Sequence, residues 1–130
     1  MFNPYEQFTT TKGDRTEIRN KEGKLHNEDG PAVMRSNGEC QWYVNGKLHR
    51  EDGPAIVRAD GTQLWYQKGK MHRVGGPAYT SPNGPTVYWR YGKIHRVDGP
   101  AVINEDGTTE WCINGVQMDP IEHFIKRSDR

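Results

Sequence analysis

Histidine comes closest to a chemical signature in this chain, because it recurs once every 23 residues. The four copies are His26, His49, His72 and His95. Imidazole is the commonest metal ligand and the side chain most often used as a general acid or base. Three copies have an aspartate three residues later, at Asp29, Asp52 and Asp98, whereas the third repeat has Gly75 there. The pattern is therefore compatible with two kinds of site, a metal centre and a His–Asp catalytic pair.

The spacing favours a structural role over both. If each 23-residue unit is one β-hairpin, equivalent histidines lie about 10 Å apart, because neighbouring strands are ~4.8 Å apart. Zinc ligands lie about 2 Å from the ion, so histidines of neighbouring units cannot share one. We predict that each imidazole hydrogen-bonds to its aspartate and holds a loop, without a metal or cofactor. No catalytic triad, phosphate loop or carboxylate pair emerges, so we expect no enzyme.

Arginines and aromatic residues recur with the same period and are candidates for binding. Arg50, Arg73 and Arg96 form one row, and guanidinium groups bind carboxylates or phosphates bidentately unless acids of their own chain occupy them. Two aromatic rows are Trp42, Trp65, Tyr88 and Trp111, and beside them Tyr43, Tyr66, Trp89 and Cys112. Consecutive strand residues point to opposite faces, so each face of a sheet receives one row. Either the array coils and buries a row, or a partner covers it.

The third repeat departs most from the other three. It has Gly75 for aspartate, Tyr79 for an aliphatic residue, the reversed order Tyr88–Trp89, and prolines on both sides of a turn. Divergence of this kind marks a specific contact or reflects relaxed constraint. The predicted partner or ligand site comprises Arg50, Arg73, Arg96, Trp65, Tyr66, Tyr79, Tyr88, Trp89, Arg90 and Tyr91.

A tandem repeat positions these residues. Its four copies, without insertion or deletion, are residues 23–45, 46–68, 69–91 and 92–114. Each copy opens with a glycine and carries a second Asn–Gly or Asp–Gly turn, with aromatic and β-branched segments between the turns. The pattern predicts an all-β fold, an elongated single-sheet array of tandem β-hairpins with two strands per repeat. The Asp-Gly-Pro-Ala element at 52–55 is expected to form a bulge or tight loop on one rim.

Both ends of the chain are expected to be caps. Residues 1–22 resemble half a repeat, with Arg19 in the place of tryptophan, which suits an outer face in water. In residues 115–130, Asp119 and Pro120 are typical of a helix N-cap and first helical position, with a capping-box glutamate after them. We predict a short capping helix from Pro120 to about Lys126 that plugs the last repeat. Its apolar face comprises Ile121, Phe124 and Ile125.

Composition excludes several classes of function. The 130 residues carry a net charge of +1, which argues against nucleic-acid binding, since that usually needs a basic face. No apolar run approaches the roughly 20 residues that span a membrane, and the first five residues do not read as a signal peptide. Cys40 and Cys112 lie three repeats apart, on the order of 30 Å by strand spacing, too far for a disulfide. Free thiols without a leader favour a cytoplasmic location.

The string Trp-Tyr-x-Asn-Gly-Lys-Leu-His, Trp42 to His49, followed by Asp-Gly, resembles the MORN repeat family over residues 23–118. The resemblance implies a curved β array that serves as a scaffold or interaction surface, without shared catalytic residues. The departure is the stretch Arg50 to Ala55 after the histidine, where a standard repeat has a shorter His-Gly-x-Gly stretch. This variant is similar to repeats in proteins of tailed phages and large DNA viruses, and in some bacterial antitoxin-like proteins.

Three functions remain open at this point. The first is a non-enzymatic protein-interaction module, which the resemblance places in a phage or virus, binding or inhibiting a host protein such as a defence component. A second copy of the chain is among its expected partners. The second is a protein that sequesters a nucleotide-like small molecule, because arginine beside aromatic rows suits phosphate and base. The third is a structural or virion-associated spacer.

Overall fold

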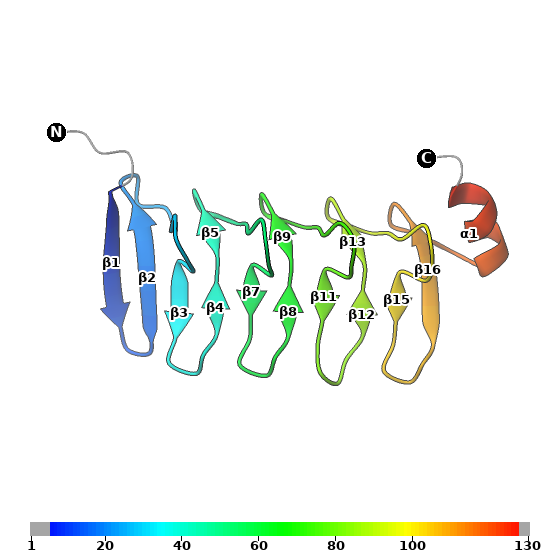
Figure 1. The fold of residues 1–130 in the computed structure, drawn as a ribbon, viewed down its shortest axis with the longest axis horizontal. Helices are drawn as coiled ribbons and strands as arrows, with labels where there is room; N and C mark the ends of the chain where they lie inside the picture. The colour runs from blue at the N-terminus through cyan, green and yellow to red at the C-terminus, as the bar shows by residue number, and fades with distance from the viewer. Residues whose placement is uncertain (1–5, 128–130) are drawn as a thin grey trace.

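The computed structural model describes residues 6–127, and the first five residues, to which the signal-peptide expectation refers, lie outside this range. Figure 1 shows an elongated array of upright antiparallel strands with one short helix at its C-terminal end. The N-terminal hairpin and the helix lie at opposite ends of the array. The predicted all-β class with a short C-terminal helix is confirmed.

One antiparallel sheet of eleven strands runs the length of the array. Its strands, in spatial order, are β1 (Gln7–Lys12), β2 (Arg15–Asn20), β3 (Val33–Arg35), β4 (Cys40–Gln41), β7 (Ile56–Val57), β8 (Gln63–Leu64), β11 (Tyr79–Thr80), β12 (Thr86–Val87), β15 (Val102–Ile103), β16 (Thr109–Ile113) and β17 (Val116–Met118). Three ribbons continue it: β5 (Tyr43–Val44) with β6 (Lys47–Leu48), β9 (Tyr66–Gln67) with β10 (Lys70–Met71), and β13 (Trp89–Arg90) with β14 (Lys93–Ile94). The ribbons show that two strands per repeat was too simple a prediction.

Two kinds of turn close the hairpins, and they use glycine differently. At Asn45-Gly46 both residues have positive φ, 49° and 82°, as a type I′ turn requires. In the second turn only Gly38 has positive φ, 97°, and its N–H donates to the carbonyl of Arg35 at 3.0 Å. That geometry is a type I turn followed by a bulge glycine. The Asn–Gly signal therefore predicted both hairpins but not their turn types.

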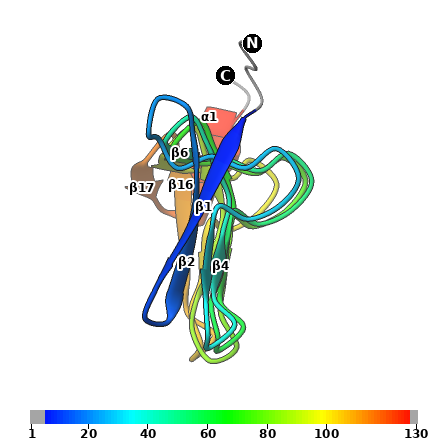
Figure 2. The ribbon, with the colours of Figure 1, turned by 90° about the vertical axis from the view of Figure 1, so that its left-hand side faces the viewer.

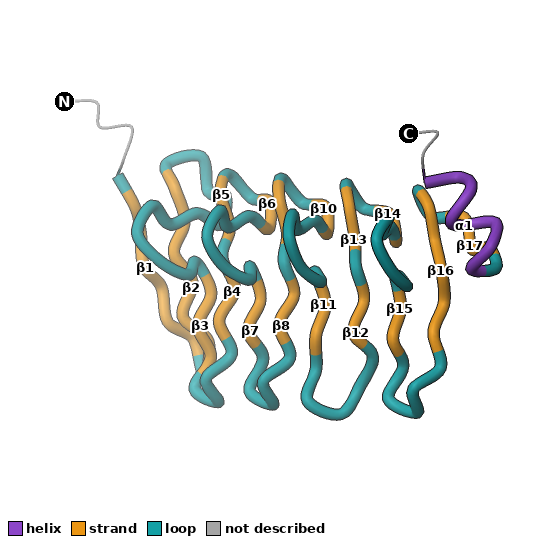
Figure 3. Tube along the Cα trace, turned by 45° about the vertical axis from the view of Figure 1, so that its right-hand side comes forward, coloured by secondary structure: helices purple, strands orange, loops and turns teal. Residues whose placement is uncertain are grey.

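The Gly-Pro-Ala segment folds over one face of the sheet instead of forming a rim. Figure 2 looks along the array and shows these loops stacked behind one another on one side, and Figure 3 shows them crossing in front of the strands. The alanine that ends each loop is fully buried, at Ala32, Ala55, Ala78 and Ala101. Proline interrupts the hydrogen-bond ladder and lets the chain leave the sheet plane. The loops thus supply a second layer over a single sheet.

The C-terminal helix α1 (Pro120–Lys126) begins as predicted. The side chain of Asp119 accepts a hydrogen bond of 2.8 Å from the N–H of Glu122, and Pro120 opens the helix. The predicted packing face is wrong, because the buried residue is His123, at 1% exposure. The apolar residues are exposed instead, Ile121 at 76%, Phe124 at 63% and Ile125 at 58%.

The orientation of the helix follows from what the last repeat presents to it, which is the ring of Trp111 and the backbone carbonyl of Arg96. His123 meets the ring of Trp111 edge-on, with centroids 5.0 Å apart, and its Nε2 donates to the carbonyl of Arg96. Aliphatic side chains could not satisfy that carbonyl, whereas an imidazole supplies both a flat ring and a donor.

Candidate functional site

Each repeat histidine joins the start of its repeat to the turn that closes it. Nδ1 of His49 accepts a hydrogen bond of 2.9 Å from the backbone N–H of Lys68, 19 residues later. The other three bonds of this kind join His26 to Asn45, His72 to Tyr91 and His95 to Asn114. A ring nitrogen that accepts carries no proton. The acceptor role of Nδ1 is therefore part of the fold.

The predicted His–Asp partnership is wrong. Nε2 of His49 bonds to Glu51 at 2.8 Å, and the first repeat makes the equivalent contact. Asp52 lies instead beside Arg50, with 3.6 Å between Oδ1 and Nε, and Asp98 lies beside the arginine of its own loop. The side chain two positions after the histidine reaches the ring. The loop changes direction before the third position, so the aspartate side chain there lies beside the arginine instead.

The arginine row stacks on the first aromatic row. The guanidinium carbon of Arg73 lies 3.8 Å from the ring centroid of Trp65, in the preceding repeat, and Nη1 donates to the carbonyl of Pro77 at 3.1 Å. The other two stacks are Arg50 on Trp42 at 3.9 Å and Arg96 on Tyr88 at 4.0 Å. The array therefore covers Trp42, Trp65 and Tyr88 of this row with its own arginines, and Trp111 meets His123 instead. Neither of the two predicted solutions, coiling or a partner, anticipated this.

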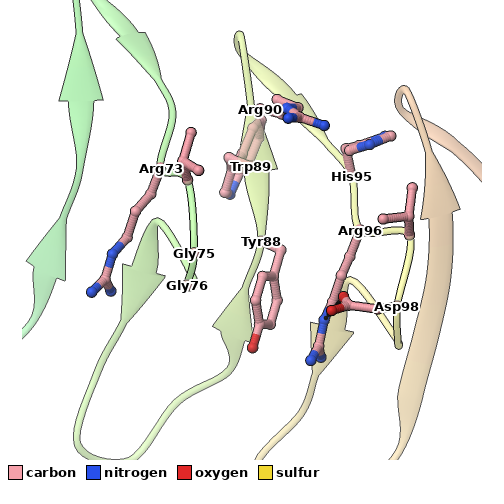
Figure 4. A pocket seen from close by; sticks show the side chains of 11 residues that line it. Arg73, Gly75, Gly76, Tyr88, Trp89, Arg90, His95, Arg96 and Asp98 are labelled. Carbon is pink, nitrogen blue, oxygen red and sulfur yellow. Dashed lines mark hydrogen bonds and ion pairs between the residues drawn. The ribbon is translucent and has the colours of Figure 1, made fainter. Parts of the chain in front are cut away.

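A groove lies between the loops of repeats 3 and 4. Residues 73–76 and 95–98 form its walls, residues 88–90 line it from the strand between them, and its volume is about 280 Å³. Figure 4 shows Tyr88, Trp89 and Arg90 along that strand, flanked by the two loops. The charged lining residues are Arg73, Arg90, Arg96 and Asp98. We call this hollow the basic groove, because cations outnumber the carboxylate.

The third repeat shapes the mouth of the basic groove differently from its neighbours. Gly75 has a φ of 87°, which an aspartate would rarely adopt, and the adjacent Val74 is 75% exposed. Tyr91 has a φ of 49°, rare for a bulky residue, and is 70% exposed. Its ring lies against His72, with centroids 4.3 Å apart. Asn45, Lys68 and Asn114 share this φ of 49°, so the third repeat differs in the bulky side chain that it places there and in the glycine at position 75.

Like charges meet beside the basic groove. Arg90 and Lys93 lie directly opposite each other on β13 and β14, an arrangement that costs stability in a sheet. The equivalent pairs are Val44 with Lys47 and Gln67 with Lys70. Ile113 pairs with Val116 at the end of repeat 4. Among these described pairs, the repulsion is therefore specific to the ribbon that joins repeats 3 and 4.

The charge distribution along the chain explains how the net charge concealed this site. Residues 61–97 hold six lysines and arginines and no aspartate or glutamate, out of 18 basic and 17 acidic residues in the whole chain. The remaining 12 basic and 17 acidic residues make the rest of the chain net negative. A net charge of +1 is thus the sum of a basic segment and an acidic remainder. The distribution of charge along the sequence, and not the total, predicts the basic site.

Burial and charge act together on His72. The ring is 8% exposed. Desolvation lowers the pKa of His72 below its ordinary value of 6.5, and the positive charge of Arg90 lowers it further. Both effects favour the neutral ring that accepts the hydrogen bond from Tyr91.

The structure brings together only part of the predicted site. Tyr88, Trp89, Arg73, Arg90 and Arg96 line the basic groove, and Tyr91 lies on the turn after Arg90. Four predicted residues lie elsewhere. Arg50 stacks on Trp42, Trp65 lies under Arg73, Tyr66 pairs with Met71 in a ribbon, and Tyr79 lies in the main sheet opposite Leu64 and Val87. Val74 was missed, and Asp98 was expected only as a partner of the repeat histidine, because the sequence pattern did not show where the loops fold.

Other classes of site are not visible in residues 6–127. No three His, Cys, Asp or Glu side chains gather there in an arrangement that could hold a metal ion. Within the same residues, no helix has the length and apolar character needed to cross a membrane. Comparison of the chain with protein-family models, with curated proteins and with solved structures gave no match.

Proposed function

We propose that this chain is a non-enzymatic protein-interaction module whose basic groove binds an acidic segment of a partner protein. The observation that carries the proposal is the acid-free stretch 61–97, which contributes Arg73, Arg90 and Arg96 to one groove. Only Asp98 among the lining residues opposes them. A carboxylate entering the groove would gain charge-assisted hydrogen bonds.

The surroundings of the groove also favour a protein partner. An incoming carboxylate would relieve the repulsion between Arg90 and Lys93. Val74 and Tyr91 offer exposed apolar surface beside the cations. Aromatic and arginine side chains are the residues enriched at the energetic centres of protein interfaces. The combination fits an acidic segment that also carries apolar side chains.

The nucleotide-binding alternative has less support from this geometry. A base would need a free aromatic face, and Arg96 already lies over the ring of Tyr88, 4.0 Å from its centroid. Arg73 and Arg96 also donate to the carbonyls of Pro77 and Pro100. These guanidinium groups hold the fold together, which leaves Arg90 as the cation best placed for a ligand.

Fluorescence anisotropy with a labelled peptide of alternating Glu and Leu tests the proposal. We expect binding that weakens with salt, because exposed charges are screened. Arg90→Glu should weaken it by at least about tenfold, which corresponds to about 1.4 kcal/mol. The positional control is Gln67→Glu, at the equivalent position of repeat 2, which changes the net charge by one unit where Arg90→Glu changes it by two. Equal binding of a Gln–Leu peptide, or equal loss in both variants, would contradict the proposal.

A further inference from the structure

A second groove, between the loops of repeats 1 and 2, has the opposite charge. Its charged lining residues are Glu28, Asp29, Glu51, Asp52 and Arg50. The carboxylates are open to solvent, with the side chain of Glu51 77% exposed and that of Asp52 92% exposed. We call this hollow the acidic groove.

The two grooves occupy the same place in the repeat, 46 residues apart. Glu28 and Asp29 of the acidic groove correspond to Val74 and Gly75 of the basic groove. Val44 corresponds to Arg90, which brings the extra cation. The backbone positions are thus shared, while a few substitutions reverse the charge. Because both sets of loops project from one side of the sheet (Figure 2), the two grooves lie on one face of the array.

We propose that two copies of the chain associate through this loop face, the acidic groove of each against the basic groove of the other. The two copies are then related by a two-fold axis that runs parallel to the strands, between the two facing loop layers and level with the boundary of repeats 2 and 3. It reverses the long axis of the second copy, so repeats 1 and 2 of one copy meet repeats 4 and 3 of the other. Both contacts are then identical, as in an isologous dimer.

Charge complementarity decides between this arrangement and its alternative. In a parallel face-to-face pairing, Glu51 and Asp52 would meet the same carboxylates of the second copy, and Arg90 would meet Arg90. Like charges facing each other across an interface cost several kcal/mol. The antiparallel pairing places each carboxylate cluster opposite the basic groove, whose charged lining is three arginines and Asp98. The inference rests on the proposed function, since the second copy supplies the acidic segment and competes with the partner for the basic groove.

Sedimentation velocity with charge-reversed variants tests the dimer. The acid-to-base variant is D29K/D52K, at two exposed loop positions. The base-to-acid variant is R90E/K93E, which leaves the stacked arginines in place. We expect the wild type to dimerise in about 0.01 M salt and to dissociate as salt approaches about 1 M, where the Debye length is ~3 Å. Each variant alone should sediment as the 14.9 kDa monomer, and an equimolar mixture should restore the dimer.

A matched mixture controls for nonspecific attraction. E22K/E105K makes the same change in net charge at exposed positions outside both grooves. Because it keeps both wild-type grooves, it should dimerise with itself, whereas R90E/K93E in the same mixture should remain monomeric. Dimerisation of D29K/D52K or R90E/K93E alone, or pairing of the control with R90E/K93E, would overturn the inference. The proposed function is separable, because D29K/D52K keeps the basic groove and should still bind the Glu–Leu peptide. A monomeric wild type that binds the peptide would overturn the dimer alone.

Discussion

The backbone N–H of Tyr91 donates a hydrogen bond of 3.0 Å to Nδ1 of His72, and the two rings lie 4.3 Å apart. A turn at the edge of the basic groove is therefore held by one unprotonated ring nitrogen. Arg90 links this turn to the groove: it lines the groove, and its positive charge lowers the pKa of His72 and so helps to keep that ring neutral.

Acid should loosen this turn. The pKa of His72 is lowered in the folded chain by burial and then by Arg90, so the unfolded chain binds the proton more tightly. Stability is then lost as pH falls below the ordinary value of 6.5, and the loss ends below the folded pKa. His72→Asn keeps an acceptor near the Nδ1 position but cannot titrate. Urea unfolding at a series of pH values should show a shallower decline for this variant; an unchanged decline would exclude His72.

Replacing two residues with strained backbone in type I′ turns should change the free energy of unfolding by different amounts. Lys68 and Tyr91 both have a φ of 49°, a conformation that asparagine tolerates better. We expect Lys68→Asn to raise the free energy of unfolding by up to about 1 kcal/mol. Tyr91→Asn should gain less, because it also loses the ring contact with His72. Chemical denaturation measures both, and a larger gain at Tyr91 would show that the ring contact contributes nothing.

Stacking should matter more than charge in the arginine row. Arg73→Lys keeps the positive charge but loses the planar contact with Trp65 and the hydrogen bond to Pro77. A loss of about 1–2 kcal/mol follows from typical values for these two interactions. Arg58→Lys, at an exposed position, is the control and should be nearly neutral. Equal stability of the two variants would show that the stack is not a determinant of the fold.

The C-terminal helix should depend on His123 and not on its apolar residues. His123→Ala removes the contact with Trp111 and the hydrogen bond to the carbonyl of Arg96. Amide hydrogen exchange in residues 121–126 should then accelerate, because the helix loses its anchor. Ile121→Ala, at 76% exposure, should leave exchange nearly unchanged. The reverse ranking would mean that the apolar face is the one that packs.

The two thiols should differ in reactivity. Cys112 is buried, and desolvation raises the pKa of its thiol, with Glu110 adding to the effect, whereas Cys40 is partly exposed. The thiolate is the reactive form. Iodoacetamide should therefore label Cys40 well before Cys112, as peptide mass spectrometry can follow. Comparable rates would contradict the burial of Cys112.

The repeat, its hairpins and the helix start could be predicted because local chemistry decides them. Positive φ at Asn45-Gly46 and the cap at Asp119 need only neighbouring residues. Contacts between repeats could not be predicted in the same way. The eight-residue step from Trp42 to Arg50 was visible, but only the fold of the intervening loop makes them stack. For the same reason His49 was given the wrong partner, since loop direction decides between Glu51 and Asp52.

The sheet hydrogen bonds run along the length of the array, so a pull on its two ends would load them in series. Such a chain does not share tension between repeats, and it separates first where one link is weakest. We expect the third repeat to be that link, because its Arg90 lies opposite the like charge of Lys93 in repeat 4. Its release would add 23 residues of chain, roughly 80 Å at full extension. The array would thus lengthen in equal steps under force, starting at the repeat that forms the groove.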